Sequence, residues 1–550
     1  MKRENEVKLR RFRLGHQRLQ RRQCKVIRVA LISLTVFASG FLIVNTHAQR
    51  PATQKLPPAE KVVERYLKAI GGKKRAATVT DATYDWIIQL NDQTIGTAQT
   101  RIKLPASFRS EMTFGNGQII SATNASSAWA SGLDGQSRTL TGPEALAAKL
   151  QGLLDASHLV DYKKANVLAR TVSVYGAASE PVYVVEFSTR NGARLRYAFS
   201  ASTNLLVQIT DETRKTVTRL DDYRSEQGVV EPHRLSVNIG GSGELIFLLQ
   251  RVSYNTGLSA TVFDSPRATE TLDVPALLRD VAKNQDEVEK RVTEYAFTQK
   301  ETDREINGKG EIKKETVKVY EIFPVANREP IQKLISENGV PLSAERAAKE
   351  EKRVQEEFLR AERDREKDAQ REQHRRAELA RKRKNSRTGE EGDDDPEISQ
   401  FLLACEFVSP RREKVGNRDA IVFDFRPRAG FHPSTRGEAL IAKLVGAVWI
   451  DPLDKQVMRI EARLAEGFKM AGGLLLSLRP GAALVMEQTR MAEGVWLPRF
   501  AQINLSVKVL LFGGGDFNKT IEWSDYRHFQ GDVGDYKLDA PKPEENKKPE

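Results

Sequence analysis

The chain has 550 residues, of which 39% are hydrophobic and 29% charged, and its formal net charge is +13. This length is sufficient for two or more domains, each with a sizeable core. Residues 1–28 contain eleven lysines and arginines against two glutamates, a balance of +9 that leaves only +4 for the rest of the chain. Because a basic leader is not a binding face on a folded domain, we expect no nucleic acid partner.

A secretory signal is the first element that the sequence predicts. Residues 29–44, "VALISLTVFASGFLIV", form an uncharged apolar run between the basic leader and "NTHAQR". Basic region, apolar core and small residues follow one another as in a signal peptide, which we place at 29–48 with cleavage after Ala48. The alternative is an uncleaved inner-membrane anchor, in which 29–44 would associate with the membrane. Both interpretations predict an exported, periplasmic protein with a short linker at 49–57.

The two cysteines, Cys24 and Cys405, lie on opposite sides of this cleavage point. A cleaved chain keeps Cys405 alone, so we expect no internal disulfide and a fold that depends on its hydrophobic cores. Cys405 stands in the apolar run "FLLACEFV", which favours a small buried core residue. No nearby histidine supports a catalytic thiol.

Residues 58–267 predict a first domain in which a helix leads into a series of strands. The helix lies in "PPAEKVVERYLKAIGG" (57–72), with proline at its start, apolar residues on one face and two glycines at its end. Short alternating segments follow, such as "TYDWIIQL", "VYVVEFS" and "RLRYAFS", separated by turn signals such as Asn116-Gly117. Strands joined by tight turns imply an antiparallel sheet, and a helical segment at 142–157 would cover one of its faces.

Residues 272–530 repeat this plan, beginning with a helical stretch at 277–295, and residues 531–550 predict a disordered tail. Three pairs of segments match in the same order, namely 183–192 with 420–430, 196–212 with 447–464, and "GVVEPHRLSV" (228–237) with "GVWLPRFAQI" (494–503). We therefore predict an α+β protein with two diverged copies of one domain, each an antiparallel sheet covered by helices.

The second copy carries a charged insertion at residues 343–397. Its first part, 343–384, has many glutamates and basic residues at i, i+4 spacing and almost no apolar stripe, which predicts a solvated helix held by ion pairs. The remainder has the composition of a flexible linker. Val354, Phe358 and Leu379 do not sustain heptads, so we favour a spacer or an arm for a protein partner over a coiled coil.

The first copy resembles a known family in several short motifs. These are the helix end "AIGG", then "LPASFRSEM", "GQIISATNASSAW", "DDYRSEQGVVEPHRLSV" and "NTGLSATVFDSP", which contains Phe263-x-x-Pro266. Together they resemble the outer-membrane lipoprotein-sorting proteins, the Lol carrier family, over residues 58–267. One departure is Asn124-Ala125, which stands before Trp129 where the family commonly has Asp-Gly. The second copy matches more loosely, and its inserted helix is not part of a simple carrier.

The resemblance implies that each sheet is a curved, incomplete barrel, closed by helices around an apolar concavity that receives acyl chains. The residues expected to line the concavities are Trp86, Ile88, Phe114, Trp129, Phe247 and Leu248 in the first copy, and Trp449, Met470, Leu474, Leu475, Leu476 and Trp496 in the second. Ordinary core packing is the alternative role for each of them. The apolar loop "MAGGLLLSL" (470–478) is also a candidate lid.

The sequence contains no recognisable catalytic constellation. The five histidines after Ala48 are scattered, and neither a zinc-binding pair, a nucleophile elbow nor a phosphate loop is present. We therefore expect no enzyme activity, no metal and no cofactor. The predicted function is binding of lipid, or of the acyl chains of lipoproteins, in an apolar cavity. The alternative is an envelope sensor or scaffold that holds a protein partner through the same fold and the 343–384 arm.

Overall fold

The computed structural model describes residues 56–239, 243–266, 272–307, 311–325, 330–361, 363, 401, 404–470, 476–491, 494–509 and 513–528. The expected signal segment, most of the charged insertion and the expected tail lie outside these residues. The described residues from Leu56 onward belong to one compact unit. The division into domains at 58–267 and 272–530 therefore stays a prediction.

The first sheet, sheet A, contains thirteen strands, and every pair of neighbours is antiparallel. Its strands are β1 (Asp81–Leu90), β2 (Gln93–Lys103), β3 (Ser107–Phe114), β4 (Gly117–Thr123), β5 (Ala128–Ser131), β6 (Ser137–Thr139), β7 (Leu168–Tyr175), β8 (Val182–Ser188), β9 (Arg194–Ser200), β10 (Leu206–Asp211), β11 (Thr216–Glu226), β12 (Val229–Ile239) and β13 (Glu244–Tyr254). The order is β6-β5-β4-β3-β2-β1-β13-β12-β11-β10-β9-β8-β7, so the first strand pairs with the last. The sheet is not closed into a barrel, because β6 and β7 form its two edges.

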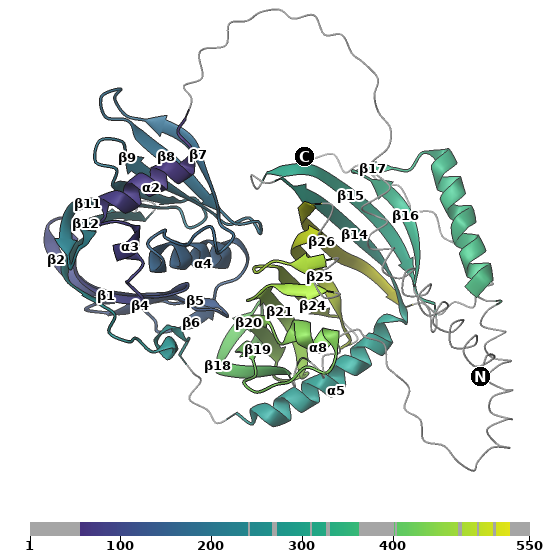
Figure 1. Cartoon of the computed structure of the whole chain (residues 1–550). Helices are drawn as coiled ribbons and strands as arrows, with labels where there is room; N and C mark the ends of the chain where they lie inside the picture. The colour runs from purple at the N-terminus through teal and green to yellow at the C-terminus, as the bar shows by residue number, and fades with distance from the viewer. Residues whose placement is uncertain are drawn as a thin grey trace, which may run out of the picture. The chain divides into compact units, whose positions relative to one another are not determined.

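This topology explains why helix α4 (Gly142–Ala156) lies over the sheet. The chain leaves the sheet at one edge, β6, and re-enters it at the other edge, β7. The helix α4 stands between these two strands and contacts β2, β3, β4, β5 and β9, inside the curve of the sheet (Figure 1). Gly152 permits this close approach, because a Cβ atom there would lie 2.4 Å from Oγ1 of Thr123. The expected helix at 142–157 thus covers the inner face.

Two motifs that are far apart in the sequence meet at the end of helix α2 (Ala59–Ala69). Gly71 has φ +109°, and a Cβ atom there would lie 2.3 Å from the carbonyl oxygen of Gly228. The amide of Val230 donates to the carbonyl of Ile70 at 3.0 Å, and the short helix α3 (Lys73–Ala76) follows. Glycine is required at 71 because both the left-handed backbone and the contact exclude a side chain. The "AIGG" motif therefore docks α2 onto the β11–β12 turn.

The second sheet, sheet B, repeats the strand order of sheet A. Its strands are β14 (Tyr295–Ile306), β15 (Ile312–Phe323), β16 (Ile331–Glu337), β17 (Val340–Pro341), β18 (Cys405–Val415), β19 (Arg418–Pro427), β20 (Leu444–Asp451), β21 (Gln456–Leu464), β22 (Phe468–Met470), β23 (Leu476–Leu478), β24 (Ala483–Arg490), β25 (Trp496–Val509) and β26 (Gly513–His528). The order β17-β16-β15-β14-β26-β25-β24-β21-β20-β19-β18 corresponds strand for strand to β4-β3-β2-β1-β13-β12-β11-β10-β9-β8-β7. The strands β22 and β23 pair with each other beside this path.

The shared order supports the predicted duplication. The phrases "GVVEPHRLSV" and "GVWLPRFAQI" fall on β12 and β25, which are equivalent strands. The Asp-Tyr-Arg triplets near them are not equivalent, because Tyr223 lies on β11 whereas Tyr526 lies on β26. The other two matched pairs also fall on equivalent strands, since 183–192 and 420–430 cover β8 and β19, and 196–212 and 447–464 cover β9–β10 and β20–β21.

Helices α5 (Val274–Val292) and α8 (Arg436–Ile441) cover sheet B near β18–β21 (Figure 1). The core between them is aromatic: the ring of Phe401 lies 4.9 Å from that of Phe425 and 5.6 Å from that of Phe407. Cys405 is fully buried in this cluster, and burial raises the pKa of its thiol to about 12. The expectation of a small buried core residue at Cys405 is confirmed.

The start of the charged insertion differs from the expected solvated helix. Residues 344–361 are helical, but Val354 is fully buried and Phe358 is 6% exposed. Both pack against Phe323 and Ile331 of sheet B, with the rings of Phe323 and Phe358 5.8 Å apart. The expectation was wrong for this stretch because two apolar residues four positions apart are enough to attach one helix face to a sheet. The rest of the arm lies outside the described residues.

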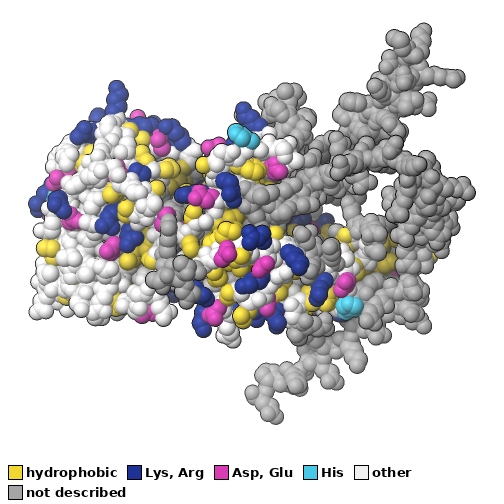
Figure 2. All heavy atoms as spheres, turned by 90° about the horizontal axis from the view of Figure 1, so that it is seen from below, with side chains coloured by type: hydrophobic (Ala, Val, Ile, Leu, Met, Phe, Trp, Pro, Cys, Tyr) yellow, Lys and Arg dark blue, Asp and Glu magenta, His cyan; other side chains and the backbone are white. Residues whose placement is uncertain are grey.

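The surface agrees with the charge distribution read from the sequence. On the face seen in Figure 2, basic and acidic side chains are interspersed rather than gathered into a single-sign field. Within the part of the chain that the structure describes, no helix is both long and apolar enough to cross a membrane.

Candidate functional site

A cavity of about 290 Å³ lies between the inner face of sheet A and helices α2 and α4. The residues that line it lie at inward-pointing positions of the strands or on the helix faces that point to the sheet. They are Tyr66, Tyr84, Trp86, Thr100, Ile102, Phe108, Ser110, Gln151, Leu154, Asp155, His158, Leu159, Tyr197, Leu206, Ile209, Thr218, Leu220, Tyr223, Glu231, Pro232, Leu235, Val237 and Phe247. The size falls at the lower end of the roughly 300–1,000 Å³ typical of ligand sites, and the lining is mostly apolar and aromatic. The cavity is therefore the candidate site.

The strand pattern creates this inner face. On β1 the inward residues Ala82, Tyr84, Trp86 and Ile88 are each at most 8% exposed. The residues between them point outward, because successive side chains of a strand point to opposite faces. The expected alternation of "TYDWIIQL" is confirmed, and it places an aromatic pair, Tyr84 and Trp86, at the cavity wall.

Glu231 on β12 is the centre of a buried polar cluster. The hydroxyls of Tyr84 and Tyr254 donate to its Oε1 at 3.0 and 2.8 Å, and Nε2 of His158 lies 3.4 Å from the same oxygen. Burial raises the pKa of the carboxyl, but the hydrogen bonds from these three partners outweigh it, so the net pKa lies below the ordinary value. The acid is therefore ionised and fully partnered.

His158 reaches Glu231 because the chain turns sharply after α4. His158 and Leu159 have φ of +46° and +62°, a backbone region that costs a non-glycine residue free energy. Burial lowers the pKa of the imidazole, but the hydrogen bond and charge of Glu231 outweigh it and raise the net pKa. Nδ1 of His158 is buried without a hydrogen-bond partner among the described residues. The strained turn thus places the imidazole of His158 beside a buried carboxylate.

Asp155, one turn earlier on α4, also faces the cavity and has a different environment. It accepts a hydrogen bond from the hydroxyl of Tyr197 at 3.3 Å. Burial raises the pKa of its carboxyl from 3.8 to about 6, against the smaller opposing effects of Gln151, Tyr197, His158 and Arg214. The two acids of the cavity therefore have pKa values displaced in opposite directions.

Only some of the residues predicted to line the cavity of the first copy do so. Trp86 and Phe247 line the cavity, Ile88 is fully buried beside it, and Phe114 packs partly buried against the same cluster. Leu248 pairs with Ile87 on the outer-facing register of β1 and β13. Whether Trp86 and Phe247 contact a ligand stays a prediction.

Trp129 has a structural role. It is fully buried, and its Nε1 donates to the carbonyl of Phe263 at 3.0 Å, while the guanidinium of Arg109 lies 5.4 Å from its ring centroid. Phe263, in the 3-10 helix η1 (Ala260–Phe263), is itself fully buried. The Trp129 and Phe263-x-x-Pro266 motifs thus meet in one packing contact.

The candidates of the second copy do not gather at one described cavity. Trp449 and Trp496 are 2% and 3% exposed and pack with Met458, and Nε1 of Trp496 donates to Asp454 at 3.0 Å. The side chains of Met470, Leu474, Leu475 and Leu476 lie outside the described part of the structure. The proposed lid at 470–478 stays a prediction.

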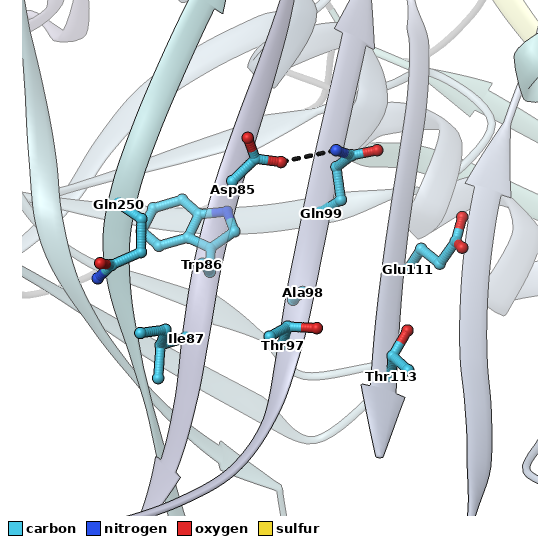
Figure 3. A pocket seen from close by; sticks show the side chains of 9 residues that line it. All are labelled: Asp85, Trp86, Ile87, Thr97, Ala98, Gln99, Glu111, Thr113 and Gln250. Carbon is cyan, nitrogen blue, oxygen red and sulfur yellow. Dashed lines mark hydrogen bonds between the residues drawn. The ribbon is translucent and has the colours of Figure 1, made fainter. Parts of the chain in front are cut away.

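A second hollow, of about 320 Å³, lies on the outer face of β13, β1, β2 and β3. Figure 3 shows Asp85 and Gln99 pointing toward each other across two strands, with a hydrogen bond of 2.6 Å between them. Asp85 also accepts from Nε of Arg251 at 2.9 Å, and Glu111 accepts from Arg109 at 3.1 Å. The carboxylates of this hollow are therefore already compensated by arginines.

Reading the sequence missed the polar cavity residues Tyr84, Asp155, His158 and Glu231, and Tyr254, which donates to Glu231. One signal was present, because Glu231 occupies an inward position of "VVEPHRLSV", between Val229 and Leu235. At the corresponding place of "GVWLPRFAQI" the second copy has Leu497, which is fully buried in an apolar cluster. A charged residue in the first copy at the position of a packed leucine in the second indicates that Glu231 is needed for more than core packing.

No family model matches the sequence, and no curated protein matches it. Among solved structures the chain is similar to a LolA superfamily protein from Nitrosomonas europaea, at 12% identity, covering 38% of this chain and 99% of that one with a TM-score of 0.28. A DUF1329 family protein from Desulfovibrio piger matches at 12% identity, 38% and 98% coverage and a TM-score of 0.27.

The complex of MucA and MucB from Pseudomonas aeruginosa matches at 8% identity over 84% of this chain and 94% of that one, with a TM-score of 0.17. Since these scores lie below 0.5, we base the assignment of function on the side chains of the cavity.

The cavity combines an apolar lining with a small group of titratable side chains. Aromatic and aliphatic side chains form most of its wall, and Asp155, His158 and Glu231 add polar groups at one place. The lining residues include neither cysteine nor lysine, and the described residues contain no group of three or more histidine, cysteine or acidic side chains placed to hold a metal.

Proposed function

We propose that the protein binds a lipid, or the acyl chain of a lipoprotein, in the cavity of sheet A, without catalysis. The observation that carries the proposal is the largely apolar cavity beneath α2 and α4, lined by seven aromatic side chains. A half-closed antiparallel sheet can enclose such a volume without leaving backbone groups unpaired. The resemblance of the first copy to the lipoprotein-sorting family points in the same direction.

The position of the protein in the cell belongs to the same proposal. The basic leader and apolar run predict export to the periplasm, where lipoproteins and phospholipids of the envelope are available as ligands. Whether the segment 29–44 is cleaved or remains as an anchor stays open, and the intact mass of the protein from an exporting host distinguishes the two.

A pair of tryptophan substitutions on β2 tests the cavity. Thr100 lines the cavity, whereas Thr97 is exposed on the opposite face of the same strand. Thr100→Trp fills the cavity, and Thr97→Trp adds the same side chain outside it. We expect native mass spectrometry and solvent extraction to find bound lipid in the wild type and in Thr97→Trp, and none in Thr100→Trp.

Two results would contradict the proposal: lipid retained in full by Thr100→Trp, or no lipid in any of the three proteins even after incubation with envelope phospholipid. Circular dichroism of both variants shows whether Thr100→Trp remains folded. The scaffold or sensor function through the charged arm stays a prediction, and it requires that deletion of residues 364–397 abolishes recovery of a protein partner.

A further inference from the structure

We propose that the ligand of the sheet A cavity carries a protonated amine, and that Asp155 is the carboxylate that pairs with it. This inference rests on the proposed function, because it names the chemistry of the ligand in the same cavity. It follows from counting the charges around the cavity and from the nature of its walls.

Asp155, His158 and Glu231 line this end of the cavity, and Asp211 and Arg214 lie next to it. The imidazole of His158 pairs with the carboxylate of Glu231, at 3.4 Å. Arg214 is occupied by Asp211, to which both its backbone amide and its Nε donate, and its Nη2 donates to the side chain of Gln151. Asp155 is thus the acid left without a cation of its own.

The hydrogen bonds of Asp155 confirm this difference. Its partners are neutral: the hydroxyl of Tyr197 and the amide of Gln151. A carboxylate whose hydrogen-bond partners are neutral is costly when buried, because burial penalises the charge and the more distant basic groups of His158 and Arg214 offset only part of that penalty. Below about pH 6 a proton fulfils this role, since burial raises the pKa of Asp155 to about 6. A ligand ammonium group would replace that proton with an ion pair.

The walls around Asp155 suit a cation with an apolar chain. Tyr66, Tyr84, Trp86, Tyr197 and Tyr223 all line the same cavity. The faces of aromatic rings attract ammonium groups, and the attraction increases when water is excluded. The chain of the amphiphile would then lie against the aliphatic side chains of β10–β13. A cavity of about 290 Å³ suits one short alkyl chain.

Other head groups fit less well. A carboxylate would bring a further negative charge beside Glu231 and Asp155, which like-charge repulsion disfavours. An alcohol could donate a hydrogen bond to Asp155 but would leave its charge uncompensated. The order of affinity that the site predicts is therefore amine, then alcohol, then carboxylate.

Three probes of equal chain length test this order: octylamine, 1-octanol and octanoate, titrated calorimetrically into the full-length chain at about pH 7.5, where Asp155 is ionised. We expect octylamine to bind at least about tenfold more tightly than 1-octanol, the effect of one buried charge pair. Asp155→Asn should remove this preference while 1-octanol affinity changes by less than about twofold. Asp161→Asn, which removes an exposed carboxylate six residues further on, should leave both affinities unchanged.

The outcomes separate the two proposals. If 1-octanol or octanoate binds as tightly as octylamine, or if Asp155→Asn keeps the amine preference, the assignment of an amine to Asp155 is wrong while lipid binding stands. If Thr100→Trp binds octylamine like the wild type, the amine binds elsewhere and the assignment fails. If none of the three probes binds, the proposed function itself fails.

Discussion

Sheet A and sheet B share one strand order, and the spaces between the sheets and their helices are filled differently. In sheet A the residues beneath α4 leave a cavity with aromatic walls and an acid that lacks a cation. In sheet B the rings of Phe401, Phe407 and Phe425 pack against one another, and α5 adds Leu277 and Val281. The same strand order therefore supports either a site or a solid core, depending on side-chain volume.

Buried acids show the same difference. Asp424 on β19 is 1% exposed and lies 2.9 Å from Nη2 of Arg411, which also contacts Glu413 at 3.1 Å. At the matching place on β8, Glu186 lies 3.3 Å from Arg196. These acids have arginine partners, as a stable fold requires. Asp155 lacks one, which is the pattern expected where a ligand completes the site.

The largest expected effect compares phenylalanines in the two inner faces. Phe425→Ala should lower the free energy of unfolding by about 3–5 kcal/mol, because a fully buried ring leaves a new void in a packed core. Phe247→Ala should cost at least about 1 kcal/mol less, because its ring already borders open volume. Urea denaturation followed by circular dichroism measures both. Equal costs would show that the sheet A cavity is as tightly filled as the sheet B core.

Next in size is the buried ion pair of sheet B. Arg411→Leu leaves Asp424 and Glu413 buried without their cation, and we expect a loss of about 3–5 kcal/mol. The same urea measurement applies, with Arg412→Leu on the neighbouring position of β18 as the control, because Arg412 is exposed. If Arg411→Leu lowered the free energy of unfolding by less than Arg412→Leu does, water would have to reach the carboxylates of Asp424 and Glu413.

Asp155→Asn should change the free energy of unfolding in the opposite direction and stabilise the protein. Because the folded pKa of Asp155 is raised from 3.8 to about 6, ionisation opposes folding as pH rises through this window, and the penalty is complete above it. The variant should be more stable than the wild type by up to about 3 kcal/mol above pH 6, and equal to it below about pH 4. Thermal unfolding at both pH values checks this. A destabilised variant at high pH would indicate that Asp155 has a structural cation partner.

The smallest expected effect concerns the donors of Glu231. Tyr84→Phe removes one of its three partners, which should cost about 1–2 kcal/mol at neutral pH. The lowered pKa of Glu231 stabilises the fold above the ordinary value of 4.5, and this contribution is lost as pH falls through the folded pKa. The difference between variant and wild type should therefore shrink in acid. Tyr175→Phe, at an exposed site, is the control and should have no effect.

Local pattern was enough to predict the elements and their repetition. The alternation of "TYDWIIQL", the glycines closing α2 and the phrase shared by β12 and β25 each depend on neighbours in the sequence, which hold the same chemistry in any context. The resemblance of the first copy supplied the curved sheet with its helix-covered inner face. The apolar residues Val354 and Phe358 were undervalued, because a helix face needs only two contacts to attach to a sheet and the heptad test looks for more.

The sequence by itself determined an antiparallel α+β fold and predicted the repetition that the strand order supports, because period and turn chemistry act over a few residues. Only the tertiary structure decided where the sheet A cavity lies and which acids lie around it. Asp155 and His158 come from the end of α4, Glu231 from β12 and Arg214 from the turn after β10, so their charges can be counted together only after folding brings them into one place. Whether one charge compensates another depends on the distance between them in the folded protein, and the order of residues does not give that distance.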